Sequence, residues 1–210
     1  YRKYSFRSSA ITAVLSAIDI ALWDIKGKRL GAPVWDLLGG KFRDRVRAIV
    51  LLGSIGYGKP TVDPDTFAAA AKYAKDIGYT ALKMTPFSPG WGEMAHGELI
   101  RNNVAIVEAV REAVGWDFDV GIEIHRNMAP GQSVVFAQQI EKFLPYFYED
   151  PIAADSVMSM GYVGDKINLP LAIGERNNTL WEFREYCTLP GVNFLKPDIG
   201  LAGGFTHVKK

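Results

Sequence analysis

The feature that most constrains the fold is a regular alternation, from residue 45 onwards, of short apolar segments with longer segments of helical periodicity. The apolar segments have the length of strands, and they lie at residues 46–52, 79–84, 119–124, 147–149, 169–173 and 192–195. The helical segments lie between them, at residues 65–76, 98–114, 133–144, 156–166 and 180–186, and a further one begins at Gly203-Gly204. Strands that alternate with helices form βαβ units, which assemble into a parallel sheet. The sequence therefore predicts an α/β fold.

The length of the repeat separates two α/β architectures. Residues 45–210 hold six units in 210 − 44 = 166 residues, or about 28 residues each, which is the repeat of a (β/α)8 barrel of about 250 residues. A doubly wound open sheet is the alternative, but no G-x-G-x-x-G motif follows the first predicted strand. We therefore expect a TIM-type (β/α)8 barrel with about six of its eight units in this chain. We interpret the sequence as part of a longer native chain, with a natural fragment as the alternative.

Residues 1–44 have a different pattern. Residues 8–24 read as a helix that is apolar nearly all round, so we expect it to be buried against more than one neighbour. A second short helix is predicted at residues 34–38, between the breaks at Gly31, Pro33 and Gly39-Gly40. The sequence therefore divides into a helical segment at 1–44 and the barrel units at 45–210.

Charge and composition exclude several classes of partner. Lys and Arg number 24 against 23 Asp and Glu, so a net charge of +1 gives no general attraction to nucleic acid or to an anionic membrane. No run of 18 apolar residues is present, so the sequence predicts no membrane-spanning helix. The single Cys187 excludes an internal disulfide, and we expect it to be a small buried apolar residue. The sequence shows no targeting signal, and we expect a cytoplasmic protein.

Three carboxylates follow three consecutive predicted strands at equal spacing. Glu123, Glu149 and Glu175 are each 26 residues apart, so we expect them on adjacent strands at the same height. Any one such Glu alone is typical of a helix N-terminus or a solvated surface. Three together raise one another's pKa unless a hard cation relieves the repulsion, and Mg²⁺ suits such oxygen ligands. The pattern therefore favours a Mg²⁺ site at the carboxyl ends of the strands, where barrels carry their active sites.

A set of short motifs in this order and spacing resembles the mandelate racemase branch of the enolase superfamily. The motifs are Glu149-Asp150-Pro151, Gly174-Glu175-Arg176, Lys196-Pro197-Asp198-Ile199 and Gly203-Gly204. Residues 17–40, AIDIALWDIKGKRLGAPVWDLLGG, resemble the last helices of that family's N-terminal α+β capping domain. The resemblance implies that residues 1–44 are the C-terminal part of the capping domain and that residues 45–210 are a partial catalytic barrel.

Within this branch the segment Glu123-Ile124-His125-Arg126 is most similar to acid-sugar dehydratases of the galactonate type. The resemblance implies that Glu123, Glu149 and Glu175 are the metal ligands and that His125 is the general acid. It implies a lyase that removes the α-proton of an aldonate or aldarate through a metal-stabilised enolate, expels the β-hydroxyl and yields a 2-keto-3-deoxy acid. The expected partner is a small sugar acid, and the family is commonly oligomeric, which implies a homo-oligomer.

The resemblance also implies catalytic roles for Asp198 and Lys83. Asp198 falls on the acid that orients a catalytic histidine, and the family places that histidine on a seventh strand, beyond residue 210. Lys83 falls where the family places a cation near the substrate carboxylate. Arg176 is a candidate for binding a substrate hydroxyl or carboxylate, with a structural ion pair to Glu123 or Asp150 as the alternative.

Two departures from the family pattern bear on the reaction. The first metal position is usually Asp in this branch and is Glu123 here, so Glu123 is the least secure ligand. Racemising members carry a second Lys two residues after the position of Lys83, where this sequence has Thr85. This difference favours elimination, with a racemase or epimerase of a hydroxy acid as the alternative. A non-catalytic fragment without its strand-seven base is the alternative from another class.

The two remaining histidines are expected to lie outside the chemistry. His207 falls on the helix that begins at Gly203-Gly204, and we expect it to be a surface residue. His96 falls in the predicted loop 86–97 after the second strand, and we expect it to be solvated.

Overall fold

The computed structural model describes residues 9–54 and 56–210, which fall into two compact units. The sheet unit comprises Arg47–Ala172 and Leu189–Phe194. The helix unit comprises the residues up to Val46 together with Ile173–Thr188 and Leu195–Lys210.

The sheet unit holds the predicted strands. They are β1 (Val50–Leu51), β2 (Ala81–Met84), β3 (Asp119–Glu123), β4 (Phe147–Glu149), β5 (Leu171–Ile173) and β6 (Val192–Leu195), the last residues of β5 and β6 belonging to the helix unit. The sheet has the order β1-β2-β3-β4-β5-β6, and the neighbours from β1 to β5 pair in parallel. The predicted parallel α/β arrangement with six strands is confirmed.

The first strand is much shorter than predicted, because only Val50 and Leu51 pair with β2. The preceding residues are extended and exposed. A side chain, and not strand pairing, joins the residues before Val50 to the sheet. The guanidinium of Arg47 donates a hydrogen bond to the carbonyl oxygen of Thr80 at 2.7 Å and forms an ion pair with Asp119. A charged side chain at this edge replaces the strand pairing that apolar, β-branched residues predicted.

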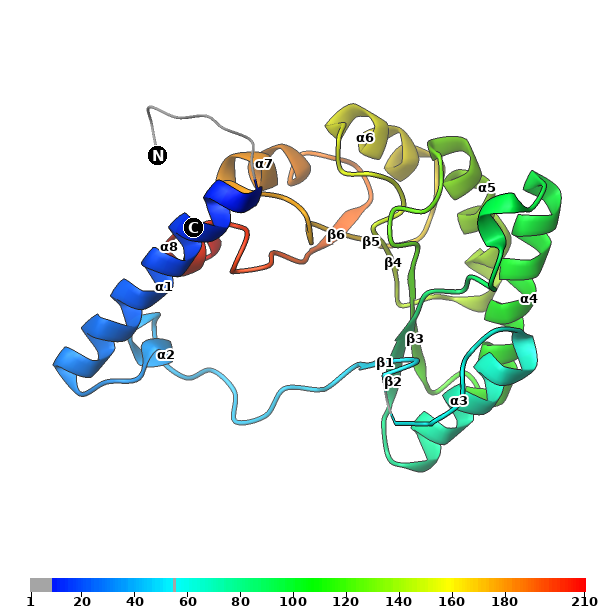
Figure 1. Ribbon diagram of the computed structural model, residues 1–210, viewed down its shortest axis with the longest axis horizontal. Coiled ribbons are helices and arrows are strands. Elements are labelled where there is room, and N and C mark those ends of the chain that lie inside the picture. Colours follow the sequence, from blue (N-terminus) through cyan, green and yellow to red (C-terminus); the bar gives the residue numbers. More distant parts are fainter. Residues whose placement is uncertain (1–8, 55) are drawn as a thin grey trace. The chain divides into compact units, whose positions relative to one another are not determined.

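Four helices of the sheet unit follow the strands in turn. They are α3 (Pro64–Asp76), α4 (His96–Val114), α5 (Pro130–Ile140) and α6 (Val157–Lys166), with short 3-10 turns at η1 (Trp91–Glu93) and η2 (Glu141–Phe143). Each of the four packs on the next, and all lie on one side of the strands (Figure 1). A doubly wound sheet has helices on both faces, so the one-sided cover is that of (β/α) barrel units.

The sequence prediction placed His96 in the loop before α4, and this was wrong. His96 is the first residue of α4, since Ala95 is extended and its carbonyl oxygen accepts a hydrogen bond from the Leu99 N–H at 2.9 Å. The rest of the predicted loop contains the η1 turn.

The core of the sheet unit lies between the strands and their helices. Strands β2 to β5 are buried along almost their whole length. The fully buried large side chains of this unit are Leu82, Met84, Ile106, Ile122, Ile124, Phe136, Ile140, Tyr148, Met160 and Leu171. Gly121 of β3 pairs in register with Phe147 of β4, and a Cβ on Gly121 would overlap the Phe147 ring. A residue without a side chain is therefore needed at this point of the sheet.

The helix unit contains α1 (Ser9–Leu30), α2 (Val34–Leu37), α7 (Thr179–Tyr186) and α8 (Gly204–Val208). Polar side chains of α1 hold the first turn of α8. Ser16 Oγ accepts from the Gly203 N–H at 3.0 Å, and Asp19 Oδ2 accepts from the Thr206 N–H at 3.1 Å. Trp23 Nε1 donates to Thr206 Oγ1 at 3.0 Å. Ser16 and Asp19 thereby bind backbone N–H groups that the start of a helix leaves without intrahelical partners.

The expectation that α1 is buried on several apolar sides was wrong for the described residues. Its buried residues are the polar or small Thr12, Ser16 and Gly27. Ser16 contacts the start of α8 through a hydrogen bond, and Gly27 lies against the carbonyl oxygen of Ala32. Most of its large apolar side chains are exposed, namely Ile11, Val14, Ile18, Leu22, Ile25 and Leu30. No helix among the described residues is both long enough and apolar enough to cross a membrane.

Two further expectations about single residues were wrong. His207, expected at the surface, is only 8% exposed, because the left-handed conformation of Gly203 (φ 99°) brings the backbone against its ring. Cys187, expected to be buried, is exposed at the end of α7.

Candidate active site

The carboxyl ends of β2, β3 and β4 bring three predicted site residues together. Glu123 is the last residue of β3, Glu149 is the last residue of β4, and the register pairs them directly. Both carboxylates are buried, with exposed fractions of 5% and 2%. The prediction that Glu123 and Glu149 lie on adjacent strands at the same height is confirmed.

Lys83, the third residue of β2, joins this pair. Its Nζ lies 2.8 Å from Glu123 Oε2 and 3.1 Å from Glu149 Oε1. Burial by itself would lower the pKa of Lys83, but the hydrogen bond to Glu123 and the charges of Glu149 and Glu123 outweigh it, and the pKa is raised. The ammonium group of Lys83 is therefore charged.

The donor set of this cluster fits a hard divalent cation. Two buried carboxylates at neighbouring strand ends offer oxygen ligands of the kind that Mg²⁺ prefers. A positive group, the ammonium of Lys83, already lies between them. The cluster is therefore built to hold positive charge.

The chain just beyond β3 and β4 takes an uncommon backbone conformation. His125, Arg126 and Asp150 have φ angles of 54°, 66° and 40°, a region that costs non-glycine residues of the order of 1–3 kcal/mol. A backbone hydrogen bond from Arg126 N to Asp150 O and an ion pair between their side chains, both 2.9 Å, hold the two segments together. Strained residues of this kind cluster at functional sites.

This conformation places His125 beside the Glu123 carboxylate. A ring nitrogen of His125 and a carboxylate oxygen of Glu123 lie within 4.8 Å of each other, and His125 is exposed. A buried carboxylate with a solvent-facing imidazole close to it suits proton transfer to a bound molecule.

The sequence reasoning missed the pair formed by Arg126 and Asp150. It considered Arg176 as a structural partner of Asp150, whereas Arg126 is the residue that binds it. The signal was present, because opposite charges directly follow the candidate residues His125 and Glu149 in the sequence.

Glu175, Arg176 and Asp198 lie in the helix unit. The register of β4 and β5 pairs Glu149 with Ala172, so Glu175 comes three residues further along the chain than the register partner of Glu149. The chain leaves β5 at Gly174 (φ 125°), and Glu175 follows in a turn closed by the hydrogen bond from Asn177 N to Gly174 O at 3.0 Å. Equal spacing along the sequence therefore did not give a register pair of Glu149 and Glu175, because the turn takes up residues.

The other two predicted residues of the helix unit have local partners. Arg176 Nε lies 3.1 Å from Glu175 Oε1. The Asp198 side chain accepts a hydrogen bond from Gly200 N at 2.7 Å, which fixes the loop between β6 and α8. The described geometry therefore holds both side chains in defined turns that follow strands.

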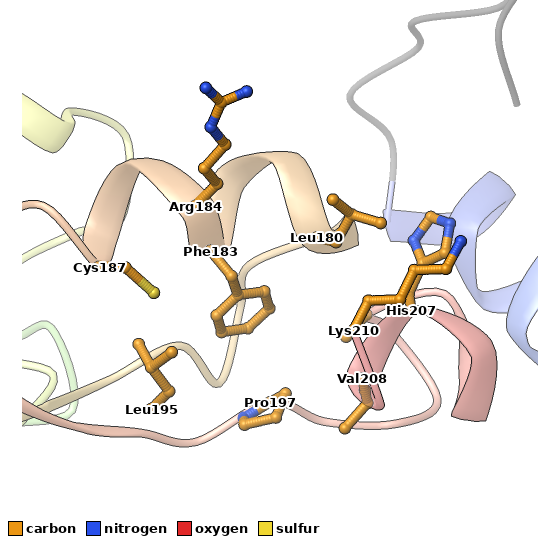
Figure 2. A pocket seen from close by; sticks show the side chains of 10 residues that line it. Leu180, Phe183, Arg184, Cys187, Leu195, Pro197, His207, Val208 and Lys210 are labelled. Atoms are coloured by element: carbon orange, nitrogen blue, oxygen red, sulfur yellow. The ribbon is translucent and has the colours of Figure 1, made fainter.

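A pocket of about 510 Å³ opens elsewhere in the helix unit. Phe183 points into it and Arg184 points away from it (Figure 2). Its lining is mainly apolar, with Leu180, Phe183, Cys187, Leu195, Pro197, Ala202 and Val208 among its residues. None of the predicted site residues is among the described residues that line it, so it is distinct from the strand-end cluster.

Comparison with known proteins gives the family. Residues 65–210 match the family model described as enolase C-terminal domain-like, and residues 2–39 match the mandelate racemase/muconate lactonizing enzyme N-terminal domain. The chain belongs to the mandelate racemase/muconate lactonizing enzyme family. The predicted membership of the enolase superfamily is confirmed, and with it the barrel-type α/β fold of residues 65–210.

Curated relatives and a solved structure agree with this family. A protein described as D-gluconate dehydratase, from Thermoproteus tenax, is 38% identical over 212 residues, covering 100% of this chain and 42% of the relative. A D-gluconate/D-galactonate dehydratase from Picrophilus torridus is 32% identical over 213 residues, covering 100% of this chain and 53% of the relative. A member of the enolase superfamily from Salmonella Typhimurium matches with a TM-score of 0.89 and 33% identity, over 94% of this chain and 54% of that structure. This enolase-superfamily chain thus spans roughly half the length of the curated relatives it matches.

Proposed function

We propose that the protein is a Mg²⁺-dependent sugar-acid dehydratase, a carbon–oxygen lyase that converts an aldonate or aldarate into a 2-keto-3-deoxy acid. The observation that carries the proposal is the register pair of buried carboxylates, Glu123 and Glu149, with a His125 ring nitrogen within 4.8 Å of a Glu123 carboxylate oxygen. The names of the curated relatives support D-gluconate and D-galactonate as the first substrates to test.

We assign the cation to Glu123, Glu149 and Glu175. The first two offer buried oxygen ligands side by side. When bound, Mg²⁺ would supply Lewis-acid stabilisation of the negative charge that develops on the substrate carboxylate as its α-proton leaves, a contribution of several kcal/mol.

His125 would act as the general acid. After a base has taken the α-proton, the bond between the β-carbon and its hydroxyl oxygen breaks, and the electron pair leaves with the oxygen. A proton from His125 makes the departing group water, and such positioned proton transfer contributes about 10² to 10⁴-fold. The remaining enol then becomes the 2-keto-3-deoxy acid.

Other residues would position the substrate and the base. Lys83 would neutralise the substrate carboxylate, and Arg176 would bind a carboxylate or hydroxyl group. Asp198, whose carboxylate is fixed by Gly200 N at 2.7 Å, would orient a histidine base. None of the three histidines in the 210-residue sequence is proposed as that base.

The decisive variant is Glu149→Gln, which keeps the shape of the side chain and removes its charge. We expect it to abolish formation of keto acid from D-gluconate and D-galactonate with Mg²⁺, followed as semicarbazone absorbance, while circular dichroism stays unchanged. Glu108→Gln, at an exposed position of α4, is the matched control and should keep full activity. Undiminished turnover in Glu149→Gln would refute the metal assignment.

A solvent-isotope experiment separates dehydration from racemisation on the same scaffold. In D₂O, dehydration yields keto acid from the consumed substrate. Substrate that gains deuterium at the α-carbon without losing water would favour the racemase or epimerase instead.

A further inference from the structure

The position of Lys83 has a consequence for metal binding. Its ammonium lies 2.8 Å from Glu123 Oε2 and 3.1 Å from Glu149 Oε1, so it binds one oxygen of each carboxylate. The Lys83 side chain is itself 19% exposed, against 7% and 2% for the two carboxylates. The lysine is therefore the most exposed member of this cluster.

Two buried carboxylates in direct register need a positive partner. Unpaired, each would pay the cost of a buried charge and would also repel the other. Lys83 supplies a compensating charge, because its ammonium lies within hydrogen-bond distance of both carboxylates. A hard cation seeks these same carboxylate oxygens.

We propose that Lys83 is the internal counter-ion of the metal-free site, and that its ammonium must leave Glu123 and Glu149 before a divalent cation can take their oxygens. This inference rests on the proposed function, since it concerns the same metal site. Leaving the carboxylates also frees the Lys83 ammonium for the substrate carboxylate. Lys83 can therefore contact the substrate carboxylate only after the cation has bound to Glu123 and Glu149.

Lys83 therefore has opposite effects on the stability of the protein without metal and on its affinity for the cation, and a single substitution tests both. Its charge stabilises the metal-free protein, and the same charge opposes cation binding because like charges repel at this distance. Lys83→Met keeps the length of the apolar stem and removes the charge. A lysine that merely pairs structurally beside an independent metal site would not raise metal affinity when it is removed.

Isothermal titration calorimetry with MgCl₂ and thermal unfolding in EDTA test the inference on the purified protein. We expect Lys83→Met to bind Mg²⁺ at least about tenfold more tightly than wild type, because one positive charge beside the cation is removed. We also expect it to unfold at a lower temperature in EDTA and to recover with Mg²⁺. The control Lys72→Met removes an exposed lysine that pairs with Asp76 at 2.7 Å and should change neither property.

The outcomes distinguish a failure of the role of Lys83 from a failure of the proposed function. Equal or weaker Mg²⁺ affinity in Lys83→Met, or unchanged stability in EDTA, would overturn the role of Lys83 and leave the proposed function standing. A wild-type protein that binds no Mg²⁺ would overturn both.

A measurement on the wild type keeps the test valid if Lys83→Met does not fold in EDTA. Reductive methylation of Lys83, read by mass spectrometry after proteolysis, should increase when Mg²⁺ is added, since the ammonium leaves the carboxylates. Methylation of Lys72 should stay constant. A Lys83 signal that is unchanged or reduced by Mg²⁺ would contradict the displacement.

Discussion

Replacing Gly164 by Ala tests how closely α6 packs within the sheet unit. Gly164 lies inside α6 and is buried. A Cβ at this position would overlap the carbonyl oxygen of Pro190, with the Pro190 carbonyl carbon at 3.3 Å and Leu171 Cδ1 at 3.2 Å. Pro190 directly precedes the turn into β6, so this contact sets the distance between α6 and the chain entering that strand.

Two effects of opposite sign decide the outcome. Helix propensity alone predicts that Gly→Ala stabilises the protein by about 0.8–1 kcal/mol. The overlap is with backbone, which cannot rotate away, and overpacking of this kind costs typically about 1–3 kcal/mol, occasionally more. Since the neighbour here is a carbonyl group and not the end of a flexible side chain, we take the upper part of that range. The expected net loss is about 1–2 kcal/mol.

Urea unfolding followed by circular dichroism measures this change. With a slope of about 2 kcal/mol per molar urea, the midpoint of Gly164→Ala should fall by about 0.5–1 M. Gly131→Ala in α5 is the matched control, because a Cβ there meets nothing within 4 Å and the position is exposed. That control should gain stability, by about 0.8–1 kcal/mol. If Gly164→Ala gains stability as Gly131→Ala does, the close approach of α6 to Pro190 is wrong.

Two further predictions concern buried polar groups. Burial, with a smaller contribution from the charge of Lys210, lowers the pKa of His207 below its usual 6.5. The folded protein therefore binds a proton at His207 less well than the unfolded chain does. The stability of the folded protein should consequently fall as the pH drops through about 6.5. Thermal unfolding between pH 7.5 and 5 should show a smaller loss for His207→Gln, and an equal loss in both proteins would contradict this. The Tyr148 hydroxyl and Ser133 Oγ are buried 3.0 Å apart, so Tyr148→Phe should cost about 1–2 kcal/mol in urea unfolding. Ser133→Ala combined with Tyr148→Phe should cost less than the sum of the two single changes, whereas strict additivity would show that the two hydroxyls do not interact.

The order and type of the elements could be predicted because the responsible signals are local. The spacing of apolar residues reports helix or strand over a few turns of chain, whatever the rest of the protein does. The strand at 119–124, for example, is observed as β3 at Asp119–Glu123, and the helix at 65–76 as α3 at Pro64–Asp76. The pairing of Glu123 with Glu149 followed from the same repeat, since both are the last residues of neighbouring parallel strands.

Features that depend on turns and on distant side chains could not be predicted in this way. Glu149 pairs in register with Ala172 and not with Glu175, because the turn at Gly174 adds residues that the 26-residue spacing does not reveal. Burial of His207 depends on the left-handed Gly203, and nothing in the periodicity of a five-residue helix indicates it.

The sequence alone was enough to predict the α/β class, the succession of units and the carboxylates that follow the strands. The folded chain was needed to show that Lys83 lies between Glu123 and Glu149 and that Arg126 binds Asp150. The physical reason is that local periodicity specifies which face of an element a residue occupies. Which charged group meets which other across 24 to 66 residues of chain is decided by the strand register and the geometry of the turns.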